Sequence, residues 1–240
     1  MASIRDIQQA LADKGFDTGG VDGVWGRKSI AAARAFQAAK GLTADGVVGP
    51  RTLAALFPGG GGTPASGGGA DTGGAPAVWY EEAKNLLGLR EGPAARDNPT
   101  ILDWADDLDI HYPHDDIPWC GLFVAHCVGS TLPDEPLPTN PLGARNWAKF
   151  GVASPVAPGA ILVFWRESPA GFKGHVGLYH GEDDTAYHVL GGNQGDSVSV
   201  TRVAKNRLVS NGIRRPASFP ALAGGVVRRK ADGTLSSNEA

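Results

Sequence analysis

The sequence has little that would place it in a membrane or in a disulfide-bonded fold. Its 240 residues include only two cysteines, which excludes a disulfide framework. No apolar run approaches the roughly 18 residues that a membrane-spanning helix needs. Lys and Arg number 22 against 25 Asp and Glu, so the net charge is −3 and the chain lacks the positive field typical of nucleic-acid-binding proteins. We therefore expect neither membrane insertion nor nucleic-acid binding.

The N-terminal residues also lack the features of a secretion signal. The stretch MASIRDIQQALADKGF mixes charged side chains among apolar ones and contains no apolar core of about 7–15 residues. This pattern predicts that the protein is made in the cytoplasm without a signal peptide.

Glycine is abundant and unevenly distributed. The chain has 35 glycines, and nine of them lie between Pro58 and Pro76, where no large apolar side chain occurs. Such a segment cannot bury enough apolar surface to offset the entropy lost on ordering, so it predicts a flexible linker. The expected organisation is a first domain over 1–57, a linker over 58–76, a second domain over 77–221 and a polar tail over 222–240.

The first domain contains an internal repeat. Residues 22–32 read DGVWGRKSIAA and residues 45–55 read DGVVGPRTLAA, with six of eleven positions identical. Each copy has an Asp-Gly turn followed by Ser or Thr before an apolar helical pattern, and a further helix precedes them. These signals predict a small all-α unit of three helices.

This pattern resembles the three-helix peptidoglycan-binding domain that is attached to many cell-wall hydrolases. The resemblance covers residues 4–56 and rests mainly on the doubled D-G-x-x-G-x-x-[ST] motif. It implies binding of bacterial peptidoglycan, with Trp25 either contacting the substrate or packing between the repeats.

The second domain predicts an α+β fold. Helical patterns come first, near residues 78–89 and 100–108, and short strand-like segments follow, among them AILVFW, GHVGLYHG and TAYHVLGG. Helices followed by consecutive antiparallel strands are typical of this class. The clearest predicted hairpin joins residues 174–181 to residues 185–191.

One cysteine lies where a nucleophile is expected. In DDIPWCGLFVAHC, Pro118 marks a helix start, so Cys120 falls in the first turn, where the helix dipole stabilises a thiolate. Cys127 lies seven residues further along the helix, about 10 Å away, too far for a disulfide. We interpret Cys127 as an ordinary buried cysteine.

A nucleophilic cysteine needs a base and a group that orients it. His175 opens a predicted strand, and the amides of Asn193 and Gln194 follow the next strand, where either is suited to accept an imidazole N–H. His188 is a further alternative, because an idealised hairpin places it near His175 on the same face.

The order of cysteine, histidine and amide resembles that of the CHAP and NlpC groups of papain-like cysteine hydrolases. The resemblance covers residues 78–216 and rests on PWCGLFVAHC, ARNWAKFG, APGAILVFWR, GHVGLYHGED, VLGGNQGDSVSV and NGIRRP. It implies a nucleophile at Cys120, a base at His175 and an orienting residue at Asn193, with His188 and Gln194 as alternatives. Trp119 either lines the substrate cleft or packs in the core.

These expectations combine into a monomeric peptidoglycan hydrolase with a Cys-His-Asn mechanism and no cofactor. The bond cut is either the N-acetylmuramoyl-L-alanine amide or one within the stem peptide.

HYPHDD (residues 111–116) is interpreted as a solvated loop, not a metal site, because no second cluster has zinc-ligand spacing. The lack of a signal fits an endolysin that reaches the wall after host lysis, or an enzyme with dedicated export. The alternatives are a non-catalytic wall-binding protein and a cytosolic cysteine protease or deamidase with an interaction module.

Overall fold

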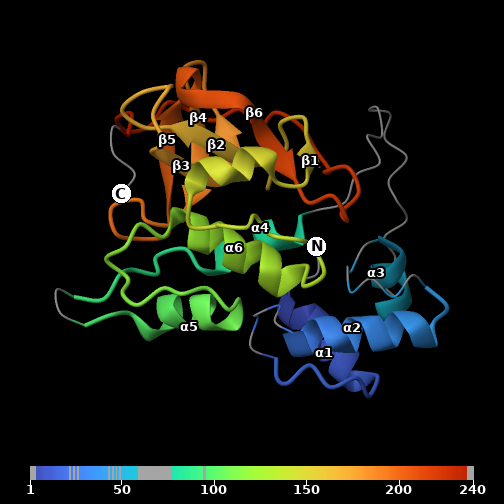
Figure 1. The fold of residues 1–240 in the computed structure, drawn as a ribbon. Helices are drawn as coiled ribbons and strands as arrows, with labels where there is room; N and C mark the ends of the chain where they lie inside the picture. The colour runs from blue at the N-terminus through green and yellow to red at the C-terminus, as the bar shows by residue number, and fades with distance from the viewer. Residues whose placement is uncertain are drawn as a thin grey trace.

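The computed structural model describes residues 4–21, 23, 25, 27–42, 44, 46, 48, 50–58, 77–93 and 96–236. Two separate hydrophobic cores lie within them, one formed by residues of the N-terminal helices and one by residues from 77 onward (Figure 1). The second core lies between helices and an antiparallel sheet, so the predicted α+β class is confirmed. Apart from Pro58, the predicted linker lies outside the described residues.

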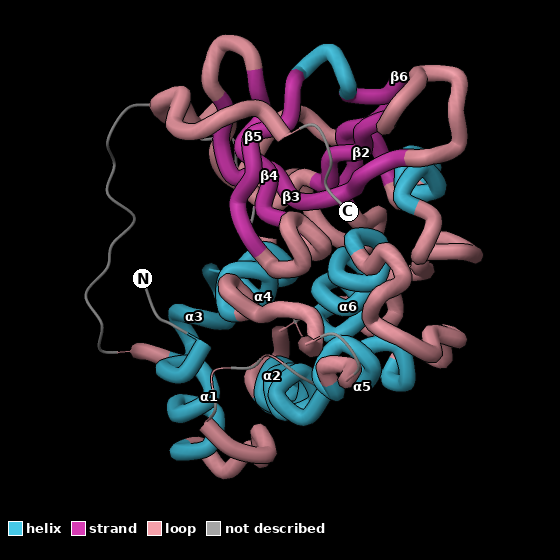
Figure 2. The backbone as a smooth tube through the Cα atoms, turned by 90° about the vertical axis from the view of Figure 1, so that its left-hand side faces the viewer, coloured by secondary structure: helices cyan, strands magenta, loops and turns pink. Residues whose placement is uncertain are grey.

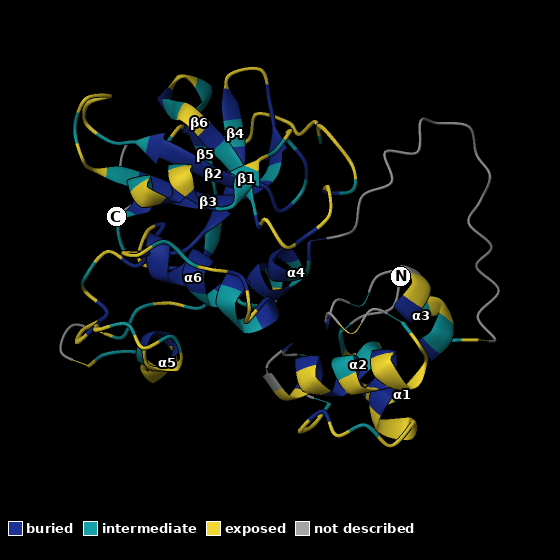
Figure 3. Ribbon diagram, turned by 45° about the vertical axis from the view of Figure 1, so that its right-hand side comes forward, coloured by how far each residue is buried: buried dark blue, intermediate teal, exposed yellow. Residues whose placement is uncertain are grey.

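The N-terminal unit consists of three helices, as the sequence predicts. They are α1 (Ile4–Asp13), α2 (Arg27–Ala39) and α3 (Pro50–Leu56). Each helix has a buried side and an exposed side (Figure 3), because its apolar residues recur at helical spacing. Leu11, Ile30, Phe36 and Leu56 meet in the core.

The two sequence repeats are stabilised by the same side-chain network. In each, a buried glutamine of the preceding helix accepts the N–H of the Asp-Gly glycine and donates to the Ser or Thr hydroxyl. Both glycines have positive φ, 84° and 78°, which a residue with a Cβ rarely adopts. The hydroxyl residues were expected just before their helices but lie in the first turns. The partners are Gln8 with Gly23 (2.8 Å) and Ser29 (3.1 Å), and Gln37 with Gly46 (2.8 Å) and Thr52 (3.2 Å).

The C-terminal unit is built on a six-stranded antiparallel sheet with the order β1-β6-β2-β3-β4-β5 (Figure 1). The predicted hairpin is present as β3 and β4. In most strands the buried positions are occupied mainly by apolar and β-branched residues, which favour the extended conformation. The strands are β1 (Val152–Ala153), β2 (Ile161–Trp165), β3 (Gly174–Glu182), β4 (Ala186–Gly191), β5 (Ser199–Ala204) and β6 (Leu208–Arg215).

Helices cover the sheet and position the candidate site. In Figures 1 and 2, α4 and α6 lie against the sheet, and α5 lies further from it. Nine of the twelve residues of α6 are buried, because its sequence CGLFVAHCVGST contains no Lys, Arg, Asp or Glu. Within the described ranges, no helix is long and apolar enough to cross a membrane. The helices are α4 (Val78–Asn85), α5 (Pro99–Asp107) and α6 (Cys120–Thr131), with 3-10 turns η1 (Ala144–Lys149) and η2 (Lys205–Arg207).

The expected polar tail is packed along the sheet up to residue 236. Leu222 is buried in the larger core, and Val227 packs against it. The backbone N–H of Val227 donates to the Tyr179 hydroxyl at 3.0 Å, and that of Ser236 donates to the carbonyl of Arg202 at 2.8 Å. Apolar side chains scattered through this polar stretch, together with these backbone hydrogen bonds, hold it against the domain.

Candidate active site

Cys120 is the first residue of α6, so the predicted helix start is confirmed. Trp119 is the N-cap, and its own side chain makes no capping hydrogen bond. The first N–H groups of a helix have no partner within it, and the helix dipole adds partial positive charge there. The Cys120 side chain therefore lies where a developing negative charge is stabilised, although only 4% of the residue is exposed.

Asn193, in the turn that follows β4, stabilises the start of α6. Its Oδ1 accepts the backbone N–H of Trp119 at 2.7 Å. Asn193 has a φ of 59°, in the left-handed region that asparagine tolerates better than most residues. Asn193 therefore holds the start of the helix that carries Cys120.

The residue that meets His175 is Gln194. Its Oε1 lies 3.0 Å from His175 Nε2, and His175 is fully buried. Gln194, which the sequence offered as an alternative to Asn193, is thus the amide that contacts His175 Nε2. The reason is the left-handed turn at Asn193, which aims consecutive side chains at different partners.

The contacts of Gln194 also determine the tautomer of His175. Gln194 Nε2 donates to the carbonyls of Val189 (3.2 Å) and Ser199 (2.6 Å), which can only accept. Its Oε1 therefore faces His175, and an amide oxygen can only accept a hydrogen bond. It follows that His175 Nε2 carries a proton, so in the neutral form of the ring the lone pair is on Nδ1.

The Cys120 thiol lies against strand β3 beside His175. Burial raises the pKa of this thiol above its ordinary value, while a hydrogen bond from the backbone N–H of Val176 and the charge of Arg166 oppose the rise. Val176 directly follows His175, so the thiol lies next to the stretch of β3 backbone that carries the imidazole. Because the pKa is raised, the thiol is protonated at neutral pH and needs a base for attack.

Trp119 packs in the core and does not line an open cleft. It is fully buried, and its ring centroid lies 6.2 Å from that of Trp104. Its Nε1 donates to Glu91 Oε1 at 2.5 Å. Burial raises the pKa of the Glu91 carboxyl, an effect that the hydrogen bond from Trp119 opposes. Of the two roles that the sequence left open for Trp119, the structure supports packing.

Trp25 has a similar position in the N-terminal unit. Only 4% of this residue is exposed, and it belongs to the core with Ile30 and Phe36. A buried ring cannot stack on a ligand without rearrangement, so this position also favours packing over substrate contact.

His188 is remote from the candidate site. The β3–β4 pairing shifts register between Tyr179 and Gly181, so His188 lies opposite Gly181. Its Nε2 contacts Asp183 Oδ2 at 3.0 Å. Without this irregularity His188 would face His180, so either pairing places it at the far end of β3 from His175.

Cys127 lies further along α6 and is not joined to Cys120. It is fully buried, and burial, with the nearby Glu82 carboxylate, raises its pKa well above the ordinary value. This thiol is therefore a weak nucleophile at neutral pH, in agreement with its interpretation as a packing residue.

Gly192 allows the turn that carries Asn193 and Gln194 to approach α6. A Cβ built at Gly192 would lie 2.5 Å from the Trp119 ring and 2.6 Å from Phe123 Cβ. Any other residue would push this turn away from the helix. Gly192 is thus required for the close approach between the turn after β4 and the start of α6.

A substitution at Gly121 tests how tightly the start of α6 is packed. A Cβ there would overlap the backbone carbonyl oxygen of Pro141, which cannot rotate away. We expect Gly121→Ala to lower the free energy of unfolding by about 1–3 kcal/mol, measured by urea denaturation. The control is Gly129→Ala in the same helix, where the Cβ would meet the flexible ends of the Leu108 and Leu137 side chains and no backbone atom of another segment. Equal losses for both variants would contradict the argument.

Comparisons with known proteins identify the N-terminal unit. Residues 1–56 match the family described as "Putative peptidoglycan binding domain". The chain is 42% identical over 61 residues to a "Probable N-acetylmuramoyl-L-alanine amidase" of Bacillus licheniformis, covering 23% of this chain and 17% of that protein. It is 44% identical over 59 residues to the "N-acetylmuramoyl-L-alanine amidase CwlL" of the same organism, covering 22% and 16%. No solved structure matches the chain significantly.

These findings assign a peptidoglycan-binding domain to the N-terminal unit and support a peptidoglycan-related function. The chain spans about a sixth of the length of the curated relatives it matches. The similarity is confined to the binding domain, so the chemistry of the C-terminal unit rests on its own residues.

Sequence reasoning missed two residues that shape the site. Glu91, which holds the Trp119 indole, comes 28 residues earlier in a loop with no recognisable motif. Arg166, whose charge acts on the Cys120 thiol, follows strand β2 directly. The only signal in the sequence for Arg166 is its place as a cation at the end of one predicted strand, just before the predicted strand that carries His175.

Proposed function

We propose that this chain is a peptidoglycan hydrolase that cleaves an amide bond of the wall with a cysteine nucleophile. One observation carries the proposal: Cys120 begins a buried helix against the strand of His175, whose Nε2 meets the amide of Gln194. A cysteine at a helix start, an imidazole of defined tautomer and an orienting amide are the groups that nucleophilic acyl transfer requires. A peptidoglycan-binding domain in the same chain supplies the substrate class.

In the proposed mechanism, His175 Nδ1 takes the thiol proton as Cys120 sulfur attacks the amide carbonyl. The tetrahedral intermediate collapses when His175 returns that proton to the leaving amine, and the acyl group stays on the sulfur. His175 then removes a proton from water, which attacks the thioester. The C–S bond breaks, the carboxylic acid is released, and the proton on His175 returns to the Cys120 sulfur. Gln194 holds the ring in one orientation through both steps.

The oxyanion of each intermediate is expected to form at the start of α6. Backbone N–H groups of a first helical turn point outward along the axis and need no reorganisation to donate. Asn193 already accepts the N–H of Trp119, so the donors must come from the residues that follow it. Fixing the helix start in this way pre-organises the site.

The N-terminal unit would keep the catalytic unit near its substrate. Tethered binding raises the effective concentration of a second site without new contacts. The bond cut is either the N-acetylmuramoyl-L-alanine amide or an amide of the stem peptide, and we expect a monomer that acts on the wall after host lysis or export.

The direct test is incubation of the full chain with purified peptidoglycan, followed by mass spectrometry of the soluble products. We expect a loss of turbidity and fragments with new amino and carboxyl ends, whose masses identify the bond. A chain that sediments with several wall chemotypes and releases nothing from any of them would be a binding protein, and the proposal would fail.

A further inference from the structure

An exposed aromatic side chain lies close to the candidate site. Phe172 is in the loop that joins β2 to β3, and 87% of it is exposed, more than any other large apolar side chain among the described residues. It precedes His175 by three residues. Three extended residues span at most about 10 Å, so Phe172 lies within that distance of the proposed base along the backbone.

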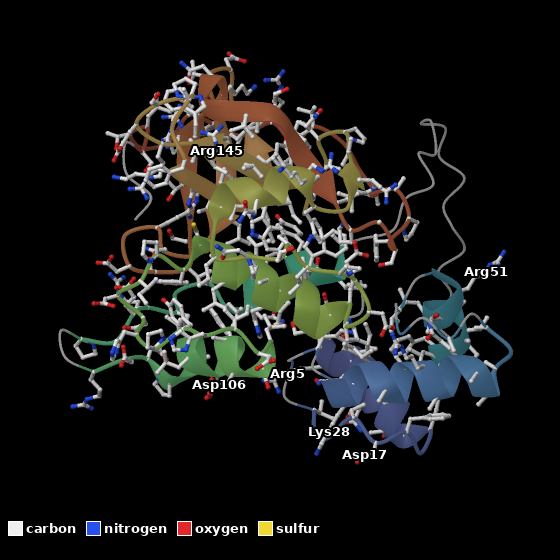
Figure 4. All side chains as sticks on the ribbon, in the orientation of Figure 1. Arg5, Asp17, Lys28, Arg51, Asp106 and Arg145 are labelled. Carbon is white, nitrogen blue, oxygen red and sulfur yellow. The ribbon has the colours of Figure 1, made fainter. Side chains whose placement is uncertain are left out.

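The loop that carries Phe172 is well ordered by polar contacts. Arg145, labelled in Figure 4, donates through Nη1 to the carbonyls of Pro169 (3.0 Å) and Gly171. Arg145 also packs closely on the backbone of Gly174. The aromatic ring is therefore presented to solvent from a fixed loop.

Ion pairing and backbone pairing close the base of the same loop. Lys173 Nζ pairs with Glu167 Oε1 at 2.6 Å, and the N–H of Arg166 donates to the carbonyl of Lys173 at 3.1 Å. A ring held outward by such contacts contributes nothing to the core. Its whole face is therefore available to a ligand that binds next to the site.

The surroundings of Phe172 determine the kind of occupant. Its neighbours Glu167, Ser168 and Lys173 are exposed and polar, so the apolar surface is a single ring and not a patch. A stable second copy needs about 800 Å² of complementary surface on each partner. A ligand with one small apolar face and a polar rim fits better, and a pyranose ring has this character, with C–H groups on its face and hydroxyls at its edge.

We propose that Phe172 stacks on a sugar ring of the wall polymer next to the amide that is cut. This inference rests on the proposed function and deepens it, because it requires a substrate that carries sugar near the scissile bond. The muramoyl-L-alanine amide satisfies that requirement, whereas an amide deep in the stem peptide does not.

The experiment compares two soluble substrates, a disaccharide-peptide and the matching sugar-free lactyl-peptide, which keeps the amide between the lactyl carboxyl and L-alanine but lacks the pyranose rings. We expect Phe172→Ala to lower kcat/KM about tenfold on the disaccharide-peptide, mainly through KM, and to leave the sugar-free peptide unchanged. Phe172→Trp should restore the wild-type value. Val226→Ala is the matched control, because Val226 is also exposed (56%) but lies on the C-terminal segment.

Several outcomes would overturn the inference. An equal loss on both substrates would indicate an effect on His175 or the peptide, and a change in oligomeric state by sedimentation would indicate a contact between copies. If wild type cleaves both substrates and Phe172→Ala changes neither rate, only the inference fails. If wild type cleaves neither, the proposed function fails, and binding of the disaccharide-peptide to the full chain with and without Phe172→Ala decides the inference.

Discussion

Replacing Cys120 with alanine is expected to abolish the release of soluble fragments from purified peptidoglycan. In the proposed mechanism the sulfur forms the bond to the acyl group, and no other described side chain at the helix start can replace it. Loss of a catalytic nucleophile typically lowers kcat by about 10⁶-fold, so the remaining rate should fall below detection. The measurement is turbidity loss together with mass spectrometry of the supernatant.

Two controls separate lost chemistry from lost structure. Cys127→Ala removes the other buried thiol of the same helix and should keep most of the activity, because that sulfur lies in the core away from His175. Cys120→Ala should still sediment with peptidoglycan, since the N-terminal unit has its own core. Fragment release by Cys120→Ala at a rate close to wild type would refute the cysteine mechanism.

The elements that carry the proposed nucleophile and base could be predicted because their signals are local. Pro118 and the apolar run after it mark the start of α6, and the β-rich stretch from Gly174 marks β3. The repeats of the N-terminal unit are equally local, since Asp-Gly turns precede both later helices. In each of these cases the pattern of a few consecutive residues determines the structure.

The partner of His175 could not be predicted, because it depends on one backbone angle. Asn193 and Gln194 are both buried amides, and an extended chain would turn only one of them inward. The φ of 59° at Asn193 breaks that alternation, so Asn193 reaches Trp119 and Gln194 reaches His175. Composition does not reveal which of two adjacent amides takes the left-handed conformation.

The place of His188 in the hairpin also depends on a detail that the sequence does not reveal. The pairing next to the turn joins Glu182 to Tyr187 and Gly181 to His188, which puts His188 at the far end of β3 from His175. The C-terminal segment also depends on contacts with residues far away in the sequence. Arg228 forms a β-bridge with Glu182, and the Val227 N–H donates to the Tyr179 hydroxyl. Non-local contacts account for most differences between expectation and structure.

Substitutions at Gln194 give the second large expected effect. Gln194→Ala removes the acceptor for His175 Nε2 and allows the ring to rotate, and we expect kcat to fall about 100-fold with little change in KM, because positioned acid–base groups contribute about 10²–10⁴-fold. Gln194→Glu keeps an acceptor but adds negative charge beside the imidazole. That charge favours the protonated ring and raises the pKa of His175, so the acid limb of the kcat/KM profile should move to higher pH.

Asn193→Ala is the matched control, because it changes the adjacent amide without touching the imidazole. It removes the acceptor of the Trp119 N–H and places alanine, which tolerates positive φ less well than asparagine, at this position, so the free energy of unfolding should fall by about 1–3 kcal/mol. Its pH profile should keep the wild-type midpoint, because His175 retains Gln194. If Asn193→Ala instead shifted the profile while both Gln194 variants left it unchanged, Asn193 would be the orienting residue and the contact at Gln194 would be structural.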